Sequence, residues 1–68
     1  MRNVILAGDI GGTKTHLALY APGSHARDPL LERKLPSQSA RSLESLIATF
    51  LEDAPETPTR AVLGIAGP

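Results

Sequence analysis

The hexapeptide GDIGGT, residues 8–13, decides how this chain folds. It stands between two short apolar segments, NVILA at residues 3–7 and THLALY at residues 15–20. Their β-branched and aliphatic residues favour strands. Two such runs joined by a glycine-rich turn are typical of a β-hairpin. The sequence therefore predicts strands over residues 3–8 and 14–20, with this turn at their tip.

The turn carries more polar groups than a hairpin requires. Asp9 precedes paired glycines and Thr13 follows them, whereas a two-residue turn needs only Asn-Gly or Gly-Gly. Paired glycines let a ligand approach the backbone, and successive amide N–H groups can surround an anion. The Thr13 hydroxyl can donate to a phosphate oxygen, and Asp9 can hold Mg²⁺ through water. We therefore predict a site for nucleotide phosphates formed by Gly8, Asp9, Ile10, Gly11, Gly12 and Thr13. A plain tight turn, with Asp9 capping backbone amides, is the alternative.

Three further elements follow the hairpin. LLERKL at residues 30–35 reads as a strand whose charges suit a sheet edge. A helix is predicted over residues 43–53, with Ser39 or Ser42 as its N-cap. Its apolar residues recur at helical spacing and form one stripe that must pack on a sheet: Leu43, Leu46, Ile47, Phe50 and Leu51.

The last strand, RAVLGIA at residues 60–66, is nearly continuously apolar, as expected of a strand covered on both faces. A strand–helix–strand connection of this length predicts a right-handed crossover, so this strand should lie beside the first and parallel to it. Ligands of such sheets bind beyond the carboxyl ends of the strands where the strand order reverses. Asp9 and Gly67 both fall at that point.

Composition narrows the function classes. Seven basic and seven acidic residues cancel, so no net charge favours nucleic acid or an anionic membrane. The chain has no cysteine and no Trp, with a single Phe and a single Tyr. This excludes thiol chemistry and a stacking platform for single-stranded nucleic acid. We expect a cytoplasmic protein, since residues 4–7 are too short an apolar run for a membrane span or a signal peptide.

Two common phosphate-binding motifs do not fit. A Walker A loop counted from Gly8 would need a second glycine where Thr13 stands. The Rossmann fingerprint would need a glycine where Ile10 stands, and a helix rather than a strand after it. What remains is a strand, the DxGGT turn and a second strand.

That arrangement resembles the first phosphate loop of the actin, hsp70 and sugar-kinase superfamily, and most closely that of the bacterial glucokinases. The resemblance rests on LAGDIGGTKT at residues 6–15 and LALY at residues 17–20. GIAGP at residues 64–68 looks like the segment that closes the first repeat of the family fold, and LESL at residues 43–46 looks like its helix start. The likeness covers the whole chain.

The resemblance implies an α/β, RNase H-like (actin-like ATPase) half-domain: a three-stranded meander, a crossover helix and a fourth strand parallel to the first. It also implies the nucleotide-binding small lobe of an ATP-dependent glucokinase, with ATP and Mg²⁺ at residues 8–13. In that family the catalytic Asp and the glucose-binding residues lie downstream, so residues 1–68 should hold no catalytic residue and be inactive alone. Alternatives are another sugar kinase, such as an N-acetylglucosamine kinase, a non-catalytic sugar-sensing relative, or a stand-alone binding module. The loop begins eight residues from Met1, which leaves no room for the DNA-binding helices of sugar-sensing repressors.

Length leads to two further expectations. Sixty-eight residues are near the size at which a single core is marginal, so we expect an N-terminal piece of a larger enzyme. An uncovered sheet edge and an uncovered apolar face both invite association. We therefore expect the chain to self-associate, as a homodimer or a less ordered assembly.

Overall fold

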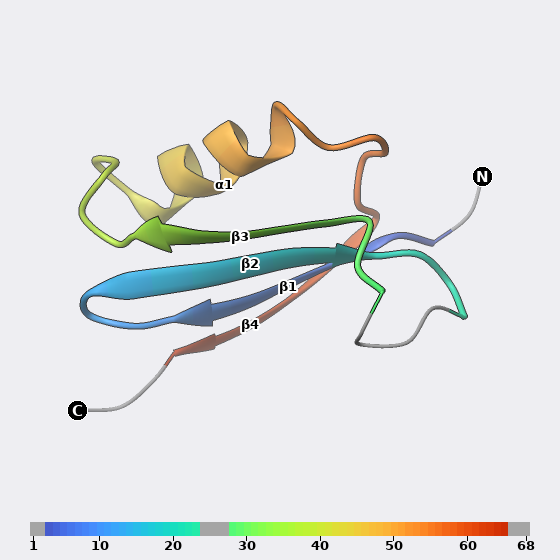
Figure 1. The fold of residues 1–68 in the computed structure, drawn as a ribbon, viewed down its shortest axis with the longest axis horizontal. Coiled ribbons are helices and arrows are strands. Elements are labelled where there is room, and N and C mark those ends of the chain that lie inside the picture. Colours follow the sequence, from blue (N-terminus) through green and yellow to red (C-terminus); the bar gives the residue numbers. More distant parts are fainter. Residues whose placement is uncertain (1–2, 24–27, 66–68) are drawn as a thin grey trace.

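The computed structural model describes residues 3–23 and 28–65. These residues form one four-stranded sheet with a single helix on one face (Figure 1). Along the chain the elements are β1 (Ile5–Ile10), β2 (Lys14–Tyr20), β3 (Leu31–Pro36), α1 (Leu43–Leu51) and β4 (Arg60–Ile65). Their order across the sheet is β3-β2-β1-β4.

The predicted topology is confirmed. β1, β2 and β3 form an antiparallel meander, and β4 runs parallel to β1. The bounds shift by a few residues: β1 begins and ends two residues later than predicted, and α1 ends at Leu51 rather than at residue 53. The predicted strand residue Ala66 and the segment containing Gly67 lie outside the described residues.

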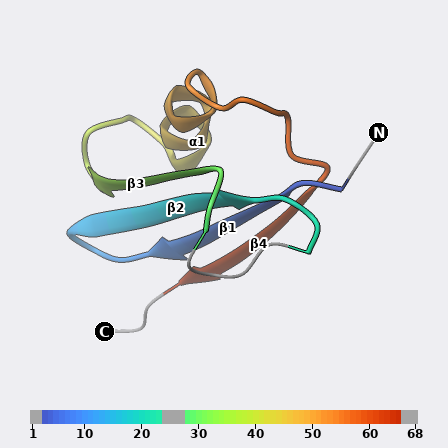
Figure 2. The ribbon, with the colours of Figure 1, turned by 45° about the vertical axis from the view of Figure 1, so that its right-hand side comes forward.

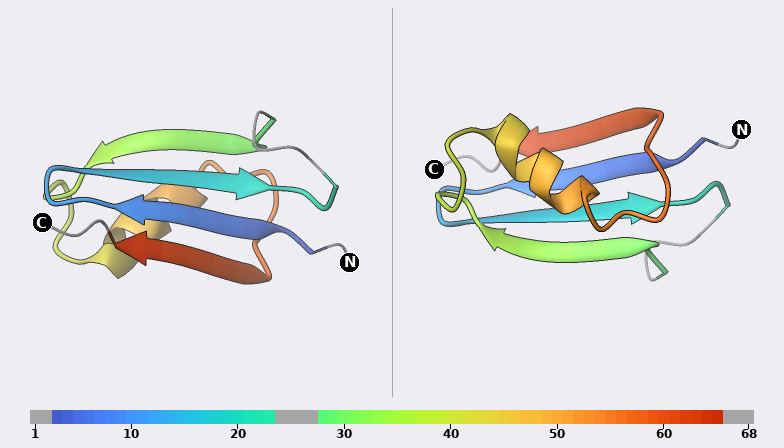
Figure 3. Two further views of the ribbon diagram at one scale, coloured as in Figure 1. Left: turned by 90° about the horizontal axis from the view of Figure 1, so that it is seen from below. Right: turned by 90° about the horizontal axis from the view of Figure 1, so that it is seen from above.

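The helix lies on one face of the sheet (Figures 2 and 3), and the core lies between the two. The predicted apolar stripe supplies it: Leu46 and Phe50 are buried, and Ile47 and Leu51 pack at the margin. From the sheet come Val4, Leu6, Leu17 and Leu19. Each such side chain contributes roughly 1.5–3 kcal/mol on burial, which fixes the face on which α1 lies.

The helix starts at the second of its two candidate caps. Ser42 is the N-cap, and its Oγ accepts a hydrogen bond from the Ser45 backbone N–H at 3.1 Å. This satisfies one of the amides that a helix start leaves unpaired.

Within the described residues no helix has the length and apolar character needed to cross a membrane.

The expectation that β4 is covered on both faces is wrong. All six of its residues are exposed, including Val62 at 60%, Leu63 at 41% and Ile65 at 80%. The reason is its place in the sheet. Among the described residues β4 is an edge strand, and the nine-residue α1 packs on a core to which β4 contributes no buried residue.

Candidate functional site

The glycine-rich turn is tighter than the sequence indicates. The predicted first strand ends at residue 8, but Asp9 and Ile10 continue β1, and residues 8–10 are paired on both sides, with β2 and with β4. Only Gly11, Gly12 and Thr13 lie between the two strands. Strand pairing on both sides of β1 takes up the backbone groups of residues 8–10, so the groups left for a ligand are those of the turn.

The turn is held in place by a serine from the end of β3. Ser37 Oγ donates to the Gly11 carbonyl at 2.6 Å and lies 2.9 Å from the buried Thr15 Oγ1. The Ser37 backbone N–H also donates to the Thr13 carbonyl at 2.8 Å. The Gly11 N–H closes the hairpin on the Lys14 carbonyl at 3.0 Å. Sequence reasoning missed Ser37, because nothing local connects a serine-rich loop to a turn more than 20 residues away.

The three glycines of the motif play different parts. A side chain on Gly8 would come within 2.7 Å of Leu63 Cδ2 and 3.0 Å of Leu17 Cδ2, and one on Gly11 within 2.8 Å of the Lys14 carbonyl oxygen. Gly12 has no atom within 4 Å of such a position, and only Gly23 among the described glycines has a positive φ. Contacts within the fold therefore explain why residues 8 and 11 are glycine, but they do not explain why residue 12 is.

Gly12 and Thr13 also present unused donors. Neither backbone N–H makes a hydrogen bond within the described part of the chain, and both residues are exposed. The Thr13 hydroxyl is likewise without a partner among the described residues. Adjacent free N–H and O–H donors on a braced turn are the groups that bind a phosphate oxygen.

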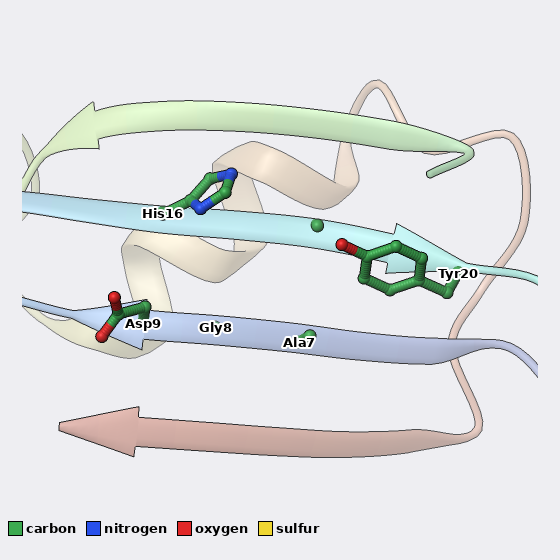
Figure 4. Close-up of a pocket in the computed structure, with 6 residues that line it drawn as sticks. Ala7, Gly8, Asp9, His16 and Tyr20 are labelled. Carbon is green, nitrogen blue, oxygen red and sulfur yellow. The ribbon is translucent and has the colours of Figure 1, made fainter. Parts of the chain in front are cut away.

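Asp9 stands next to this turn on the face of the sheet that α1 does not cover (Figure 4). Its cross-strand neighbour is His16, whose Nε2 lies 2.6 Å from Glu32 Oε2 on β3. A small open hollow of about 160 Å³ runs along this face to Tyr20. Its lining residues are Ala7, Gly8, Asp9, His16, Ala18 and Tyr20.

Size and ligand chemistry limit what this face can bind. Pockets that enclose drug-sized molecules commonly measure about 300–1,000 Å³, so this open hollow is smaller than such a pocket. No group of three or more His, Asp or Glu among residues 3–23 and 28–65 could hold a metal ion. A divalent cation at Asp9 would therefore depend on one carboxylate together with water and ligand oxygens, a common arrangement for Mg²⁺ at a phosphate.

Comparison with known families identifies the chain. A glucokinase family model matches residues 6–68. The chain belongs to the glucokinase family. The matched region contains the turn, Asp9 and, apart from Ile5 at the start of β1, the whole of the sheet and helix, and the observed sheet is that of the expected α/β half-domain. Membership makes this a sugar kinase-like segment, and the family implies ATP use. A comparison with curated proteins found no significant match.

Proposed function

We propose that this chain is the phosphate-binding N-terminal segment of an ATP-dependent glucokinase. In this proposal residues 1–68 are the first part of the nucleotide-binding small lobe of a longer kinase, acting on ATP and glucose in the cytoplasm. Gly12 carries the proposal. It is a glycine that neither backbone conformation nor packing requires, beside free amides and an exposed carboxylate. Close approach of a ligand to the backbone explains it.

The residues of the turn then have distinct roles. The amides of Gly12 and Thr13 and the Thr13 hydroxyl bind phosphate oxygens. Gly11 allows the chain to turn against the Lys14 carbonyl, and Ser37 holds the turn in that shape. Gly8 and Ile10 support the site as strand residues, because their backbone groups belong to the sheet.

The Asp9 carboxylate is suited to hold the Mg²⁺ that the family implies. It is an exposed carboxylate at the end of β1. It would hold the ion through water, since no further ligand cluster is present among the described residues. Bound Mg²⁺ offsets the charge of the phosphates during transfer. Asp9 itself orients the hydrated cation next to the turn.

In this proposal the general base is not among residues 1–68. Phosphoryl transfer to a sugar needs a group that takes the hydroxyl proton. Asp28 and Asp53 are exposed and lie off the sheet, outside all four strands and the helix. Neither stands beside the turn in sequence, so neither is assigned this role. The base and the sugar-binding residues would then lie outside residues 1–68, and the 68-residue chain alone would be inactive.

A coupled assay that follows ADP release tests this function in a kinase carrying the segment. We expect turnover with ATP and glucose, and none with the 68-residue chain. Gly12→Val should raise the KM for ATP several-fold and leave the KM for glucose nearly unchanged. Preference for N-acetylglucosamine would indicate another sugar kinase, and absence of turnover with any sugar would indicate a sugar-sensing relative. An unchanged ATP KM in Gly12→Val would refute the phosphate site.

A further inference from the structure

Ser37 follows the end of β3 and bonds to the tip of the β1–β2 hairpin, which lies beside it (Figure 1). Its Oγ donates to the Gly11 carbonyl at 2.6 Å and lies 2.9 Å from Oγ1 of the buried Thr15. A serine hydroxyl has one proton to donate. Since that proton goes to the Gly11 carbonyl, the Thr15 hydroxyl is the donor to Ser37. The hydrogen bonds therefore run from Thr15 to Ser37 and from Ser37 to Gly11.

The Gly11 carbonyl belongs to the same peptide group as the Gly12 N–H. No described peptide bond is cis, and in a planar trans peptide the C=O and the following N–H point in opposite directions. The bond from Ser37 holds the carbonyl toward the buried Thr15 and so directs the Gly12 N–H outward. Gly12 is exposed, and its N–H has no partner within the described part of the chain. Ser37 thus sets the direction in which this free donor faces.

The same peptide group can turn over when that bond is absent. It lies between two glycines, which adopt positive φ about as readily as negative φ, and nothing comes within 4 Å of a Cβ position at Gly12. Among the described residues, the bond from Ser37 is the one hydrogen bond that this group makes. A turned-over group would present a carbonyl oxygen where the N–H now stands. That oxygen would repel phosphate, because both carry negative charge.

We propose that Ser37 is a positioning residue for nucleotide binding: it keeps the Gly11–Gly12 peptide group in the orientation that offers the Gly12 N–H to a phosphate oxygen. The inference rests on the proposed phosphate-binding function of the turn. Ser37 acts through the backbone, since its hydroxyl proton is used by the Gly11 carbonyl. Without that hydroxyl the half-buried Gly11 carbonyl would be unpaired, and a turn outward to water would remove the cost. Loss of the hydroxyl therefore favours the orientation that repels phosphate.

Residual dipolar couplings of the 68-residue chain test the orientation, because they report the direction of each N–H bond. Ser37→Ala should change the coupling of the Gly12 N–H and leave those of β1 and β2 nearly unchanged. Ser39→Ala is the matched control from the same loop: the Ser39 Oγ also donates to a carbonyl, at 2.7 Å, but to that of Pro36. It should leave the Gly12 coupling as it is. An unchanged Gly12 coupling in Ser37→Ala would overturn the proposal.

Steady-state kinetics in a kinase that carries the segment test the consequence for ATP. Ser37→Ala should raise the KM for ATP roughly three- to tenfold, about the ratio that one net hydrogen bond maintains between two states. The KM for glucose should stay nearly unchanged. Ser37→Thr keeps the hydroxyl and should restore the KM for ATP, and Ser39→Ala should not alter it. If Ser37→Ala does not fold, Ser37→Cys, whose thiol is a weaker donor, makes the same test with a smaller change. Equal rises in both KM values would indicate general damage and overturn the positioning role.

Gly12→Val separates this inference from the function on which it rests. If Gly12→Val raises the KM for ATP and Ser37→Ala does not, the turn binds phosphate without help from Ser37, and only the positioning role is wrong. If neither variant changes the KM for ATP, the phosphate site itself is wrong and the positioning role is wrong with it. A rise in both variants, with recovery in Ser37→Thr, is the expected result.

Discussion

The face of the sheet beneath α1 and the face turned away from it hold different kinds of side chain. Beneath the helix, Leu6, Leu17 and Leu19 are almost completely buried. On the other face, Asp9, His16 and Glu32 remain partly or fully exposed, with Tyr20 at the far end of the hollow (Figure 4). Since strand residues alternate between faces, each strand contributes to both. One face is responsible for stability, and the other, with its turn, is available for chemistry.

This division means that stability and function should respond to different substitutions. Changes beneath the helix should lower the free energy of unfolding, whereas changes at the turn or on the open face should alter kinetics and leave the fold intact. The following predictions test the division in order of decreasing expected effect. Unfolding is measured on the 68-residue chain at one fixed protein concentration, because association contributes to apparent stability. Kinetics are measured in a kinase that carries the segment.

The largest effect is expected for Leu17→Ala. Leu17 is 0% exposed and belongs to the core cluster, so its truncation leaves a cavity and should cost about 2–5 kcal/mol in urea unfolding. Val62→Ala is the control, because Val62 is 60% exposed and lies on the other face. It should change stability by less than about 0.5 kcal/mol. Similar losses for both variants would show that the covered face has no special role.

Asp9→Ala should produce the largest fall in kcat among these variants and leave the fold nearly unchanged. If Asp9 orients the hydrated magnesium at the transferring phosphate, its loss should lower kcat by roughly 10²–10³. The KM for glucose should rise far less, because the proposed glucose-binding residues lie elsewhere. Steady-state kinetics with ATP and glucose varied separately measure both. Asp53→Ala, at an exposed position after α1, is the control and should be nearly normal. Near-normal turnover of Asp9→Ala would reduce the motif to a structural turn.

Two neighbouring glycines offer a test within the turn itself. In Gly11→Ala the new methyl would lie 2.8 Å from the Lys14 carbonyl oxygen, so the backbone must shift at a cost of about 1–3 kcal/mol. In Gly12→Ala nothing lies within 4 Å and φ is not positive, so stability should change by less than about 0.5 kcal/mol. Urea unfolding of both variants measures the difference. Equal destabilisation would show that Gly12 is there for the fold and would remove the argument for a ligand.

Local sequence patterns predicted most of this fold. The helical spacing of the stripe from Leu43 to Leu51 predicted which helix face is buried, and the two apolar runs around GDIGGT predicted the hairpin. The crossover rule placed β4 beside β1. Each of these signals depends on residues close together in the chain or on a general handedness. That is why they could be inferred without the structure.

Other features depend on contacts that no local pattern carries. An apolar run such as that of β4 is typical of a buried strand, but whether it is covered depends on the length and position of the one helix. The Ser37 contacts with Gly11 and Thr15, and the pairing of His16 with Glu32, join residues from separate strands. The phosphate-binding role of residues 8–13 was inferred from the motif and stays a prediction.

The smallest effect is expected on the open face, at the pair formed by His16 and Glu32. Their Nε2 and Oε2 atoms are 2.6 Å apart, but the side chains are 38% and 48% exposed. Water therefore screens the interaction and competes for both groups, and exposed pairs typically contribute about 0–1 kcal/mol. Glu32→Gln keeps the shape and the capacity to hydrogen-bond, so it should lower unfolding stability by less than about 1 kcal/mol. Any difference should shrink further in 0.5 M salt, where the Debye length is about 4 Å.

Ser37→Ala tests a hydrogen bond to a buried group for comparison. It removes the partner of the Thr15 hydroxyl, and Thr15 is only 1% exposed. The substitution should therefore lower the free energy of unfolding by more than Glu32→Gln does, about 1–3 kcal/mol. If Glu32→Gln were the more damaging of the two, the open face would contribute to stability as the covered face does, and the division between the faces would fail.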